Sequence, residues 1–371
     1  MDHDLLIVGA GPVGCVIAER ASKLYGLKSI ICDTRNHIAG NCYDTKNSKE
    51  ILIHRYGPHY FRTNDYSLLN YLKKFSKFHD AKYEIKSSVN NKLYQFPINL
   101  NTLNEVFDAK LNNENDAKLF LKSKSLKLSK VSNFEDYLLT NVGKELYEFF
   151  YKNYTTKQWG ISPKNLPADI AKRVPIRFNL DNRYLVEKFQ VMPSSGFTSM
   201  FKNMIDAKDI KILLKTDFFK IKDFLIPKLA TIYTGPIDKY FNYQYGKLGW
   251  RSINFKFETF KKNYYQKYVQ INYPNSFNFT RKVEIKHVTL QKSEYTTISK
   301  DFPNNSGDPY YPINTKKDVE KYKKYLLLTK KLKNTFFIGR LAEYTYINTD
   351  QAIKKGIDFS NTKLKKLVHG N

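Results

Sequence analysis

Cysteine is scarce in this sequence, and its distribution excludes a disulfide framework. Only three cysteines occur among 371 residues: Cys15, Cys32 and Cys42. They are odd in number, crowd into the N-terminal region and lack the spacing of metal ligands. We therefore expect a reduced, cytoplasmic protein that holds no metal ion.

Long hydrophobic runs are also missing. The most apolar stretch is the first twenty residues, which contain Gly9, Gly11, Pro12 and Gly14 and begin with acidic rather than basic residues. Such a stretch is neither a signal peptide nor a transmembrane helix, so we expect no membrane insertion.

Acidic residues are few compared with basic ones. The chain has 35 Asp and Glu against 62 Lys and Arg, which gives a net charge of +27. A nucleic-acid-binding protein needs such cations along a phosphate backbone, and retention on DNA at physiological salt would reveal one. The lysines are scattered over the whole chain, however, without one long basic block. We interpret most of these lysines as solvated surface residues and expect the others to attract an anionic ligand electrostatically. We expect no nucleic-acid partner.

What the sequence does contain is a dinucleotide-binding pattern at its N-terminus. An apolar strand leads into Gly9-x-Gly11-x-x-Gly14, an amphipathic helix and a second strand that ends at Asp33. The first glycine allows a tight turn, the second lets the backbone approach a pyrophosphate, and the third permits close packing of helix on strand. Asp33 stands where the pattern requires a carboxylate for a ribose hydroxyl. The predicted cofactor contacts of this unit are Gly9, Gly11, Pro12, Val13, Gly14, Asp33 and Thr34.

Two further segments favour FAD over a nicotinamide cofactor. A second polar, glycine-bearing loop follows the acid directly, and its predicted cofactor contacts are Arg35, Gly40 and Asn41. FAD proteins of the glutathione reductase type often carry such a loop. Near the C-terminus, "NTFFIGRLAEY" runs from a short apolar strand into Gly339 and Arg340, which can return the chain to the flavin end of the cofactor. The alternative for this late element is an ordinary closing strand.

The pattern of apolar residues divides the chain into three regions of an α/β protein. Phe134, Leu138, Val142 and Leu146 recur at helical spacing and predict an inserted helical substrate domain over residues 101–194. Alternating segments such as "SINFKFETF" predict an antiparallel β-sheet domain over residues 236–330. The remaining segments are assigned to a discontinuous, Rossmann-like FAD-binding domain: residues 1–100, 195–235 and 331–371.

Several long motifs, in the same order, resemble those of the flavin-dependent UDP-galactopyranose mutases of the bacterial type. They are "YTTKQWG", "LPADIAKRVPIRF", "DNRYL", "YTGPIDKYFNYQYG", "GDPYYPIN" and "GRLAEYTY", and the resemblance extends to about Ile353. It implies an isomerase that interconverts UDP-galactopyranose and UDP-galactofuranose through a covalent adduct of reduced FAD with the anomeric carbon, without net redox change. It also implies a homodimer whose product serves a capsule or another cell-surface polysaccharide.

The same resemblance assigns roles to individual residues. Diphosphate ligands are expected to be Arg173, Arg281, Tyr184, Tyr311 and Tyr346. Contacts with the base and the sugar are expected from Phe150, Tyr154, Trp159, Asn272 and Arg62. Contacts at the flavin end are expected from His59, Arg251, Asn99, Arg340 and Asn348. Within these sets, the residues predicted to be catalytic are Arg173, Arg281, His59 and Arg251.

Five positions depart from the family pattern. Ala39 and Ser195 stand in place of glycines, Ile285 and Arg62 in place of histidines, and Asn348 in place of an aspartate. Together these departures leave open which sugar the substrate carries and, to a smaller extent, which nucleotide.

Arg62 is the most informative departure, because a guanidinium offers a fork of five donors. It could hold the carbonyl of a 2-acetamido group, which predicts activity on UDP-N-acetylgalactosamine as well as UDP-galactose. The alternative is that Arg62 only pairs with phosphate or with a carboxylate such as Asp65. A more remote alternative for the whole chain is a flavin oxidoreductase of the amine-oxidase type, which would need an apolar substrate tunnel in place of the arginine pair.

Overall fold

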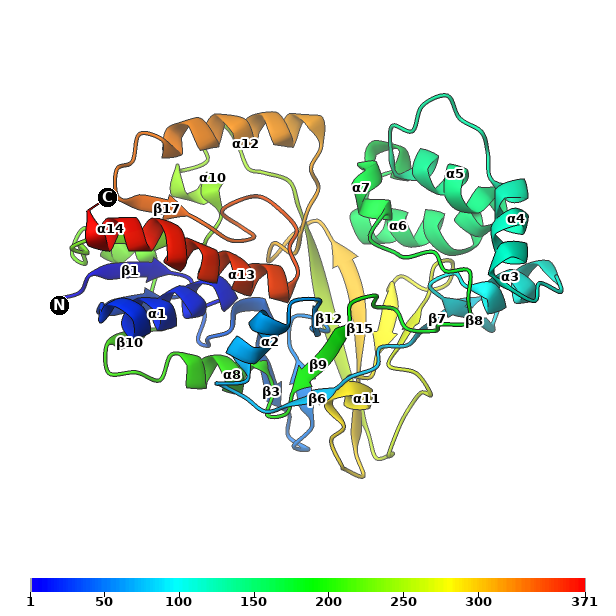
Figure 1. Ribbon diagram of the computed structural model, residues 1–371, viewed down its shortest axis with the longest axis horizontal. Helices are drawn as coiled ribbons and strands as arrows, with labels where there is room; N and C mark the ends of the chain where they lie inside the picture. The colour runs from blue at the N-terminus through cyan, green and yellow to red at the C-terminus, as the bar shows by residue number, and fades with distance from the viewer. Residues whose placement is uncertain (1, 371) are drawn as a thin grey trace.

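A five-stranded parallel sheet organises one end of the molecule (Figure 1). The computed structural model describes residues 2–370. The order of the strands is β10 (Ile210–Leu213), β2 (Ser29–Cys32), β1 (Leu5–Val8), β11 (Ala230–Tyr233) and β17 (Thr335–Phe337). The predicted α/β fold with a Rossmann-like domain is confirmed.

Both faces of this sheet are covered, which explains why its central strand reads as an unbroken apolar run. Leu5 and Ile7 of β1 pack into a core shared with helix α1 (Pro12–Tyr25) and α13 (Thr349–Phe359). Leu6 points the other way, into a core that includes Phe218 of α9 (Phe218–Ile221). The remaining helices of this half are α8 (Phe197–Met204), α10 (Ile237–Tyr240), α12 (Lys316–Thr329), the π-helical turn η4 (Ser360–Leu364) and α14 (Lys365–His369).

A seven-stranded sheet forms the middle of the molecule (Figure 1). Its pairs are antiparallel except for β13 with β7, which run parallel. The order is β16 (Tyr311–Pro312), β12 (Trp250–Phe260), β15 (Thr296–Asn304), β14 (Arg281–Val283), β13 (Gln270–Asn272), β7 (Ile85–Val89) and β8 (Lys92–Phe96). The short helix α11 (Lys286–Thr289) follows β14.

The other end of the molecule is helical, as the apolar spacing predicts. Phe134, Leu138, Val142 and Leu146 are all buried on α5, so they form the internal face of this bundle. The helices are α3 (Leu100–Phe107), α4 (Glu114–Lys124), α5 (Phe134–Leu146), the π-helical turn η2 (Tyr147–Tyr151), α6 (Lys152–Trp159), the 3₁₀ turn η3 (Pro163–Asn165) and α7 (Ala168–Ala171).

Two small sheets connect the halves and carry the loop between His54 and Phe61. One contains β3 (Asp44–Lys46) and β4 (Leu52–His54), and it follows the 3₁₀ turn η1 (Gly40–Cys42). The other contains β5 (Phe61–Thr63), β9 (Phe189–Pro193) and β6 (Phe78–Asp80), and α2 (Tyr66–Leu72) lies between β5 and β6 in the chain. This loop is therefore anchored by a strand at each end.

Two segments lie outside the regions to which the sequence pattern assigned them. β7 and β8 belong to the seven-stranded sheet, although they fall within the first hundred residues. α12 packs against β17 and α10 of the Rossmann-like half, although it falls before residue 331. The reason is physical: hydrogen-bonded pairing decides which sheet a strand joins, and local periodicity carries no record of the partner.

Three findings concern sequence features that bear on function. The three cysteines are buried and free. Among residues 2–370, no group of three or more His, Cys, Asp or Glu side chains is arranged to hold a metal ion. None of the helices in that range is long and apolar enough to cross a membrane.

Candidate active site

A cavity of about 690 Å³ runs from the carboxyl ends of the parallel strands towards the helical domain. Val8, Cys32 and Tyr233, the last residues of β1, β2 and β11, line it at one end. Open α/β sheets bind ligands in this position because the strand ends and helix N-termini leave unpaired backbone groups there.

The glycine turn builds a cradle at that end. A Cβ atom on Gly9 would come within 2.1 Å of the Thr234 hydroxyl, and one on Gly40 within 3.0 Å of the Gly11 Cα. The two loops approach so closely that only glycine fits, and α1 begins at once with its amides facing the cavity.

The cradle also contains an acidic group. Asp33 accepts hydrogen bonds from the backbone amides of Ala10 and Arg35, both at 2.9 Å, so its carboxylate is held at the rim. The other predicted residues that line this end are Pro12, Val13, Thr34, Arg35 and Asn41. These residues fit a nucleotide cofactor.

A histidine loop forms the next wall of the cavity. His59 donates from Nδ1 to the Gly57 carbonyl at 2.9 Å, and its backbone amide donates to Nδ1 of His54 at 3.1 Å. Burial lowers the pKa of both His59 and His54 to about 4. Both rings are therefore neutral at neutral pH, and His59, which lines the cavity, presents an uncharged surface to whatever binds beside it.

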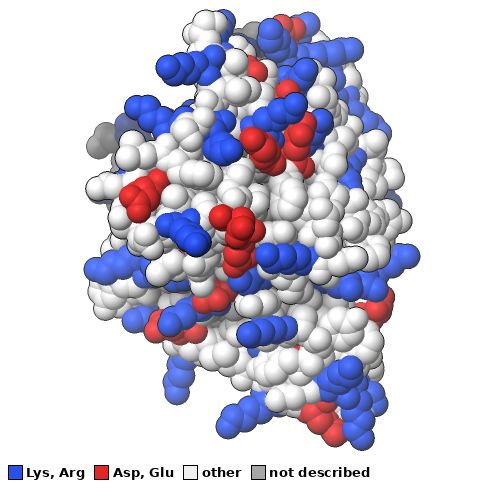
Figure 2. Space-filling view, turned by 90° about the vertical axis from the view of Figure 1, so that its right-hand side faces the viewer, with Lys and Arg blue, Asp and Glu red and all other residues white. Residues whose placement is uncertain are grey.

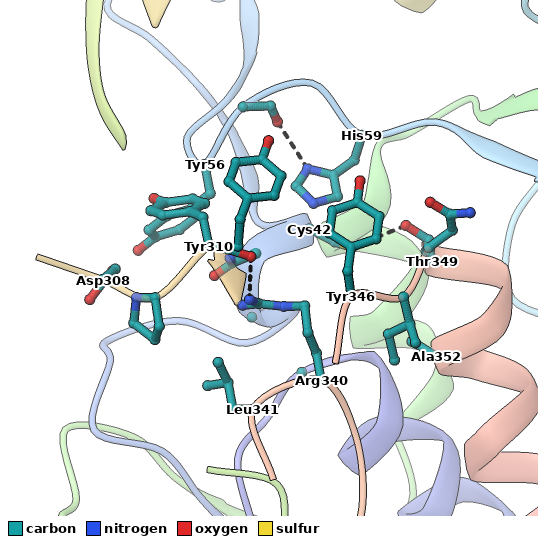
Figure 3. Close-up of a pocket in the computed structure, with 18 of the residues that line it drawn as sticks. Cys42, Tyr56, His59, Asp308, Tyr310, Arg340, Leu341, Tyr346, Thr349 and Ala352 are labelled. Atoms are coloured by element: carbon teal, nitrogen blue, oxygen red, sulfur yellow. Dashed lines mark hydrogen bonds between the residues drawn. The ribbon is translucent and has the colours of Figure 1, made fainter. Parts of the chain in front are cut away.

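Arg340 supplies a cation in the middle of the cavity (Figure 3). It follows β17, and its Nη1 donates to the Tyr310 carbonyl at 2.6 Å. Burial lowers the pKa of Arg340 to about 10, so the guanidinium keeps its charge at neutral pH. Figure 3 shows Tyr310 and Tyr346 on either side of it, with His59 beyond.

A second cation, Arg281, is fixed by a buried carboxylate. Arg281 on β14 faces Asp301 on the neighbouring strand β15, and its Nε donates to Oδ2 of Asp301. Asp301 is fully buried, and its Oδ1 has no hydrogen-bond partner among the described residues. Burial by itself lowers the pKa of Arg281, but the Asp301 carboxylate and Tyr311 raise it well above its ordinary value.

A third cation, Arg173, lies among aromatic rings. Its guanidinium carbon is 3.3 Å from the centroid of the Tyr346 ring, which stacks on Tyr311 with the centroids 5.6 Å apart. Burial raises the pKa of Tyr311 to about 12, so its hydroxyl remains a donor. Tyr184 also lines this end. The two arginines and three tyrosines predicted as diphosphate ligands thus line one cavity, although they come from different domains.

The end of the cavity within the helical domain is aromatic. Phe150 and Tyr154 line it from the π-helical turn and from α6, and the ring of Trp159 lies 5.6 Å from that of Tyr311. Asn272 lines it from β13, where its Oδ1 accepts from Gln270.

Tyr151 also lines this end, and its hydroxyl is buried without a partner among the described residues. Sequence reasoning missed Tyr151, although it directly follows Phe150. Four other lining tyrosines were also missed: Tyr56, Tyr60, Tyr83 and Tyr310. Tyrosine is so common in this chain that its type alone gave no signal.

Three predicted site residues do not reach the cavity. Gly14 packs against β1, since a Cβ there would come within 2.1 Å of the Gly9 carbonyl oxygen. Asn99 is fully buried at the start of α3, where it accepts from the Thr102 amide and donates to Asn182. Gly14 is thus engaged in packing and Asn99 in helix capping, and the cofactor contacts predicted for them stay predictions.

Arg251 is the third predicted site residue that does not line the cavity. Its Nε and Nη2 donate to the carbonyls of Gln158 and Lys157, each at 3.0 Å, and Nη1 donates to Asn305. Arg251 thus satisfies the last carbonyls of α6, which the helix itself leaves unpaired. It does not line the cavity, and its predicted place at the flavin and sugar end stays a prediction.

Among the five departures from the family pattern, only Arg62 and Asn348 line the cavity. Asn348 caps the N-terminus of α13, and its backbone amide donates to the Gln351 side chain at 2.9 Å. Ala39 is buried with a left-handed φ of 70°, the conformation that glycine adopts without strain. Ser195 is exposed, and Ile285 is buried in the core.

Arg62 pairs with a carboxylate, as the second sequence-based alternative expects, but the carboxylate is that of Glu187 and not that of Asp65. Its Nη1 lies 3.4 Å from the Glu187 carboxylate, whereas Asp65 caps α2 through the amides of Ser67 and Leu68. Both members of the Arg62–Glu187 pair are partly exposed, so the guanidinium remains accessible to a ligand.

Comparison with known sequences places the chain among sugar-nucleotide mutases. The family model for UDP-galactopyranose mutase matches residues 149–346, and the model for an NAD(P)-binding Rossmann-like domain matches residues 7–75. A probable UDP-galactopyranose mutase of Klebsiella pneumoniae is 35% identical over 99% of this chain and 96% of its own. A dTDP-fucopyranose mutase of Escherichia coli is 32% identical over 98% of this chain and 99% of its own.

Solved structures show the same fold. The crystal structure of a reduced UDP-galactopyranose mutase matches with a TM-score of 0.78 at 12% identity, over 99% of this chain and 96% of that one. A putrescine oxidase matches with a TM-score of 0.61 at 12% identity, over 98% and 99% of the two chains. A fold shared with an oxidase does not by itself decide the chemistry. The sequence relatives, alike over nearly their whole length, confirm the resemblance: the chain belongs to the UDP-galactopyranose mutase family.

Proposed function

We propose that this protein interconverts UDP-galactopyranose and UDP-galactofuranose with reduced FAD as its cofactor. The observation that carries the proposal is the joining of two sites in one cavity. A glycine cradle with Asp33 lies at one end, and Arg173 and Arg281 lie with three tyrosines further in. An oxidase acting on a neutral amine would have no use for this arginine pair, whereas a diphosphate requires it.

The residues present fit FAD. Gly11 and Gly40 leave the room that a pyrophosphate needs beside the first turn of α1, and Asp33 is held where a ribose hydroxyl would reach it. The neutral His59 and the charged Arg340 would flank the isoalloxazine ring. When bound and reduced, FAD supplies the nucleophile for the anomeric carbon of the sugar.

The side chains of the protein would bind the substrate and stabilise charge. Arg173 and Arg281 would neutralise the diphosphate as it departs with its negative charge. Arg281 is already held by Asp301, so it pays little orientational entropy when the substrate arrives. The hydroxyl of Tyr311, which stays protonated, would donate to a phosphate oxygen, as would those of Tyr184 and Tyr346.

The base would bind in the aromatic end. Tyr154 and Phe150 would sandwich or flank the uracil, Trp159 would shape the same face, and Asn272 would contact the sugar nucleotide beside them. These contacts orient the anomeric carbon towards the flavin end, because the diphosphate ligands lie between the two.

The decisive experiment is a product assay on the dithionite-reduced holoprotein. We expect UDP-galactofuranose from UDP-galactopyranose by chromatography, and no turnover with the oxidised protein. Amines offered to the oxidised protein in air should yield no hydrogen peroxide. Peroxide formation without any furanose would overturn the proposal in favour of an amine oxidase.

The sugar and nucleotide specificity can be read from the same assay. We propose that UDP-N-acetylgalactosamine is also a substrate, because the Arg62 fork lines the cavity and, among residues 2–370, is held only by a 3.4 Å contact with Glu187. dTDP-fucopyranose belongs in the panel because a 32% identical relative carries that activity in its name. We also infer that the enzyme works in the cytoplasm as a homodimer, which sedimentation velocity can test, and that its product serves a capsule or another cell-surface polysaccharide.

A further inference from the structure

Two segments far from the cavity combine many lysines with few acids. Residues 117–131 contain five lysines and no acidic residue. Residues 316–333 contain eight lysines and two acidic residues. One of those acids, Asp318, is buried, and its carboxylate accepts hydrogen bonds from Thr315 and Lys321. It therefore offsets little charge at the surface. We call these two segments together the basic edge.

The first segment is an open loop that presents apolar side chains to solvent. α4 ends at Lys124 and α5 begins at Phe134, and every residue from 126 to 132 is exposed. Leu126, Leu128 and Val131 are 41–44% exposed. Lys127 and Lys130, which alternate with them, form no ion pair with any described residue.

The second segment is a helix that lies on the surface. Tyr325 of α12 is buried against the Rossmann-like half, so the opposite side of the helix faces outward. That outer side carries Leu327, which is 60% exposed, and Lys323, Lys330 and Lys331 are exposed near it. A lysine-rich helix with leucines in contact with water is typical of segments that lie at a lipid–water interface.

The two segments share one edge of the molecule. In Figure 1, α12 runs along the upper edge on one side, and the loop between α4 and α5 rises to the same edge on the other. Figure 2 is turned about the same vertical axis and so keeps this edge at the top, where lysine or arginine side chains lie among uncharged ones and a few acidic ones. A flat surface could touch both segments at once.

We propose that the basic edge docks reversibly on an anionic lipid surface. Lysines near such a surface each contribute an attraction that adds up over the edge, and the exposed leucines can enter the headgroup region. The proposal does not depend on the catalytic activity, because no residue of the basic edge lines the cavity.

Other occupants fit the basic edge less well. A nucleic acid would bind the lysines, but its phosphate backbone offers no apolar surface for Leu126, Leu128 and Leu327 to contact. A second copy of the chain would place lysines against lysines, and like charges repel across an interface. Anionic lipid is the partner that satisfies both the charge and the apolar side chains.

The test is flotation of the holoprotein with lipid vesicles. We expect binding to phosphatidylcholine vesicles that contain phosphatidylglycerol, weak binding to phosphatidylcholine alone, and release by salt. The charge variants are Lys127→Gln with Lys130→Gln, and Lys330→Gln with Lys331→Gln. Each should lower the partition coefficient by about tenfold or more, and the two pairs together should lower it further. Leu126→Ser with Leu128→Ser should weaken binding at unchanged charge.

Matched controls lie elsewhere on the surface. Lys262→Gln with Lys267→Gln, in the connection after β12, removes the same charge and should change partitioning by no more than about threefold. Phe224→Ser with Ile226→Ser, on the exposed loop after α9, matches the apolar change and should have no effect. Melting temperature and furanose formation should be unchanged in all variants, which shows that they are folded.

Four results would overturn the proposal. Equal losses in the edge and control lysine variants would indicate attraction by net charge alone. An unaffected leucine variant would show that no apolar contact is made. Tighter binding to a DNA duplex than to vesicles, with loss through the same lysines, would assign the edge to nucleic acid. A change of oligomeric state in the leucine variant would make the edge an interface between copies of the chain.

Discussion

Truncating the two arginines that are expected to bind the diphosphate should separate catalysis from stability, because only one of them has a buried counter-ion. Arg281 pairs with the fully buried Asp301, whereas Arg173 lies over the Tyr346 ring and forms no ion pair with a described carboxylate. Each guanidinium is expected to give the diphosphate a charge-assisted contact worth about 1.5–3 kcal/mol. Arg173→Ala and Arg281→Ala should therefore each lower kcat/KM at least about tenfold, with flavin content retained.

The stabilities of the two variants should differ. Arg281→Ala leaves the Asp301 carboxylate buried without its partner, which costs about 3–5 kcal/mol in comparable buried pairs. Arg173→Ala loses one cation–π contact, worth about 0.5–2 kcal/mol. Urea unfolding of both holoproteins, followed by circular dichroism, measures this difference.

A second substitution provides the control. Adding Asp301→Asn to Arg281→Ala removes the buried charge, so it should recover most of the lost stability and none of the lost turnover. The reasoning fails if Arg281→Ala unfolds no more easily than Arg173→Ala, or if the double variant stays as unstable as the single one. If both single variants turn over like the parent, the diphosphate binds elsewhere.

Three further predictions concern other parts of the cavity. The pKa values of His54 and His59 are lowered from 6.5 to about 4, so the unfolded chain binds more protons than the folded one between these values. Stability should therefore fall as the pH drops from about 6.5 to about 4, and His59→Gln should flatten the profile in unfolding titrations; an unchanged profile would mean that His59 is not buried neutral. Arg62→His should selectively lower turnover of UDP-N-acetylgalactosamine while activity on UDP-galactose is largely kept, measured as the ratio of the two rates; parallel loss on both sugars would contradict a role at the acetamido group. The purified protein should be yellow, and Gly11→Val should abolish its flavin absorbance, because the valine side chain fills the gap between Gly11 and Gly40; a yellow variant would place the cofactor away from this turn.

The dinucleotide unit could be predicted from the sequence because its determinants are local. Gly9, Gly11 and Asp33 are placed by one strand, one turn and one helix, so their spacing along the chain is enough to bring them together. The buried stripe of α5 is local in the same sense, since helical geometry alone puts Phe134 and Leu138 on one face.

The substrate end could not be derived in that way. Arg173 follows α7 in the helical domain, whereas Arg281 lies on β14 of the seven-stranded sheet. Only tertiary packing brings them to one cavity, and only the resemblance to known motifs predicted it. The same limit explains the misplaced domain boundary near β7 and β8, whose pairing partners are remote in the chain.

Arg251 shows what a motif can and cannot say about a residue. Its guanidinium donates hydrogen bonds to the last carbonyls of α6, and a Cβ on Gly160 would come within 2.7 Å of its Nη1. The C-terminal end of the helix and the arginine side chain are therefore closely packed. α6 also carries Tyr154 and Trp159, which line the cavity. We therefore expect Arg251 to act on the site through the position of that helix, as a positioning residue. A resemblance can mark such a residue as part of the site, but the carbonyls that it satisfies are visible only once the chain is folded.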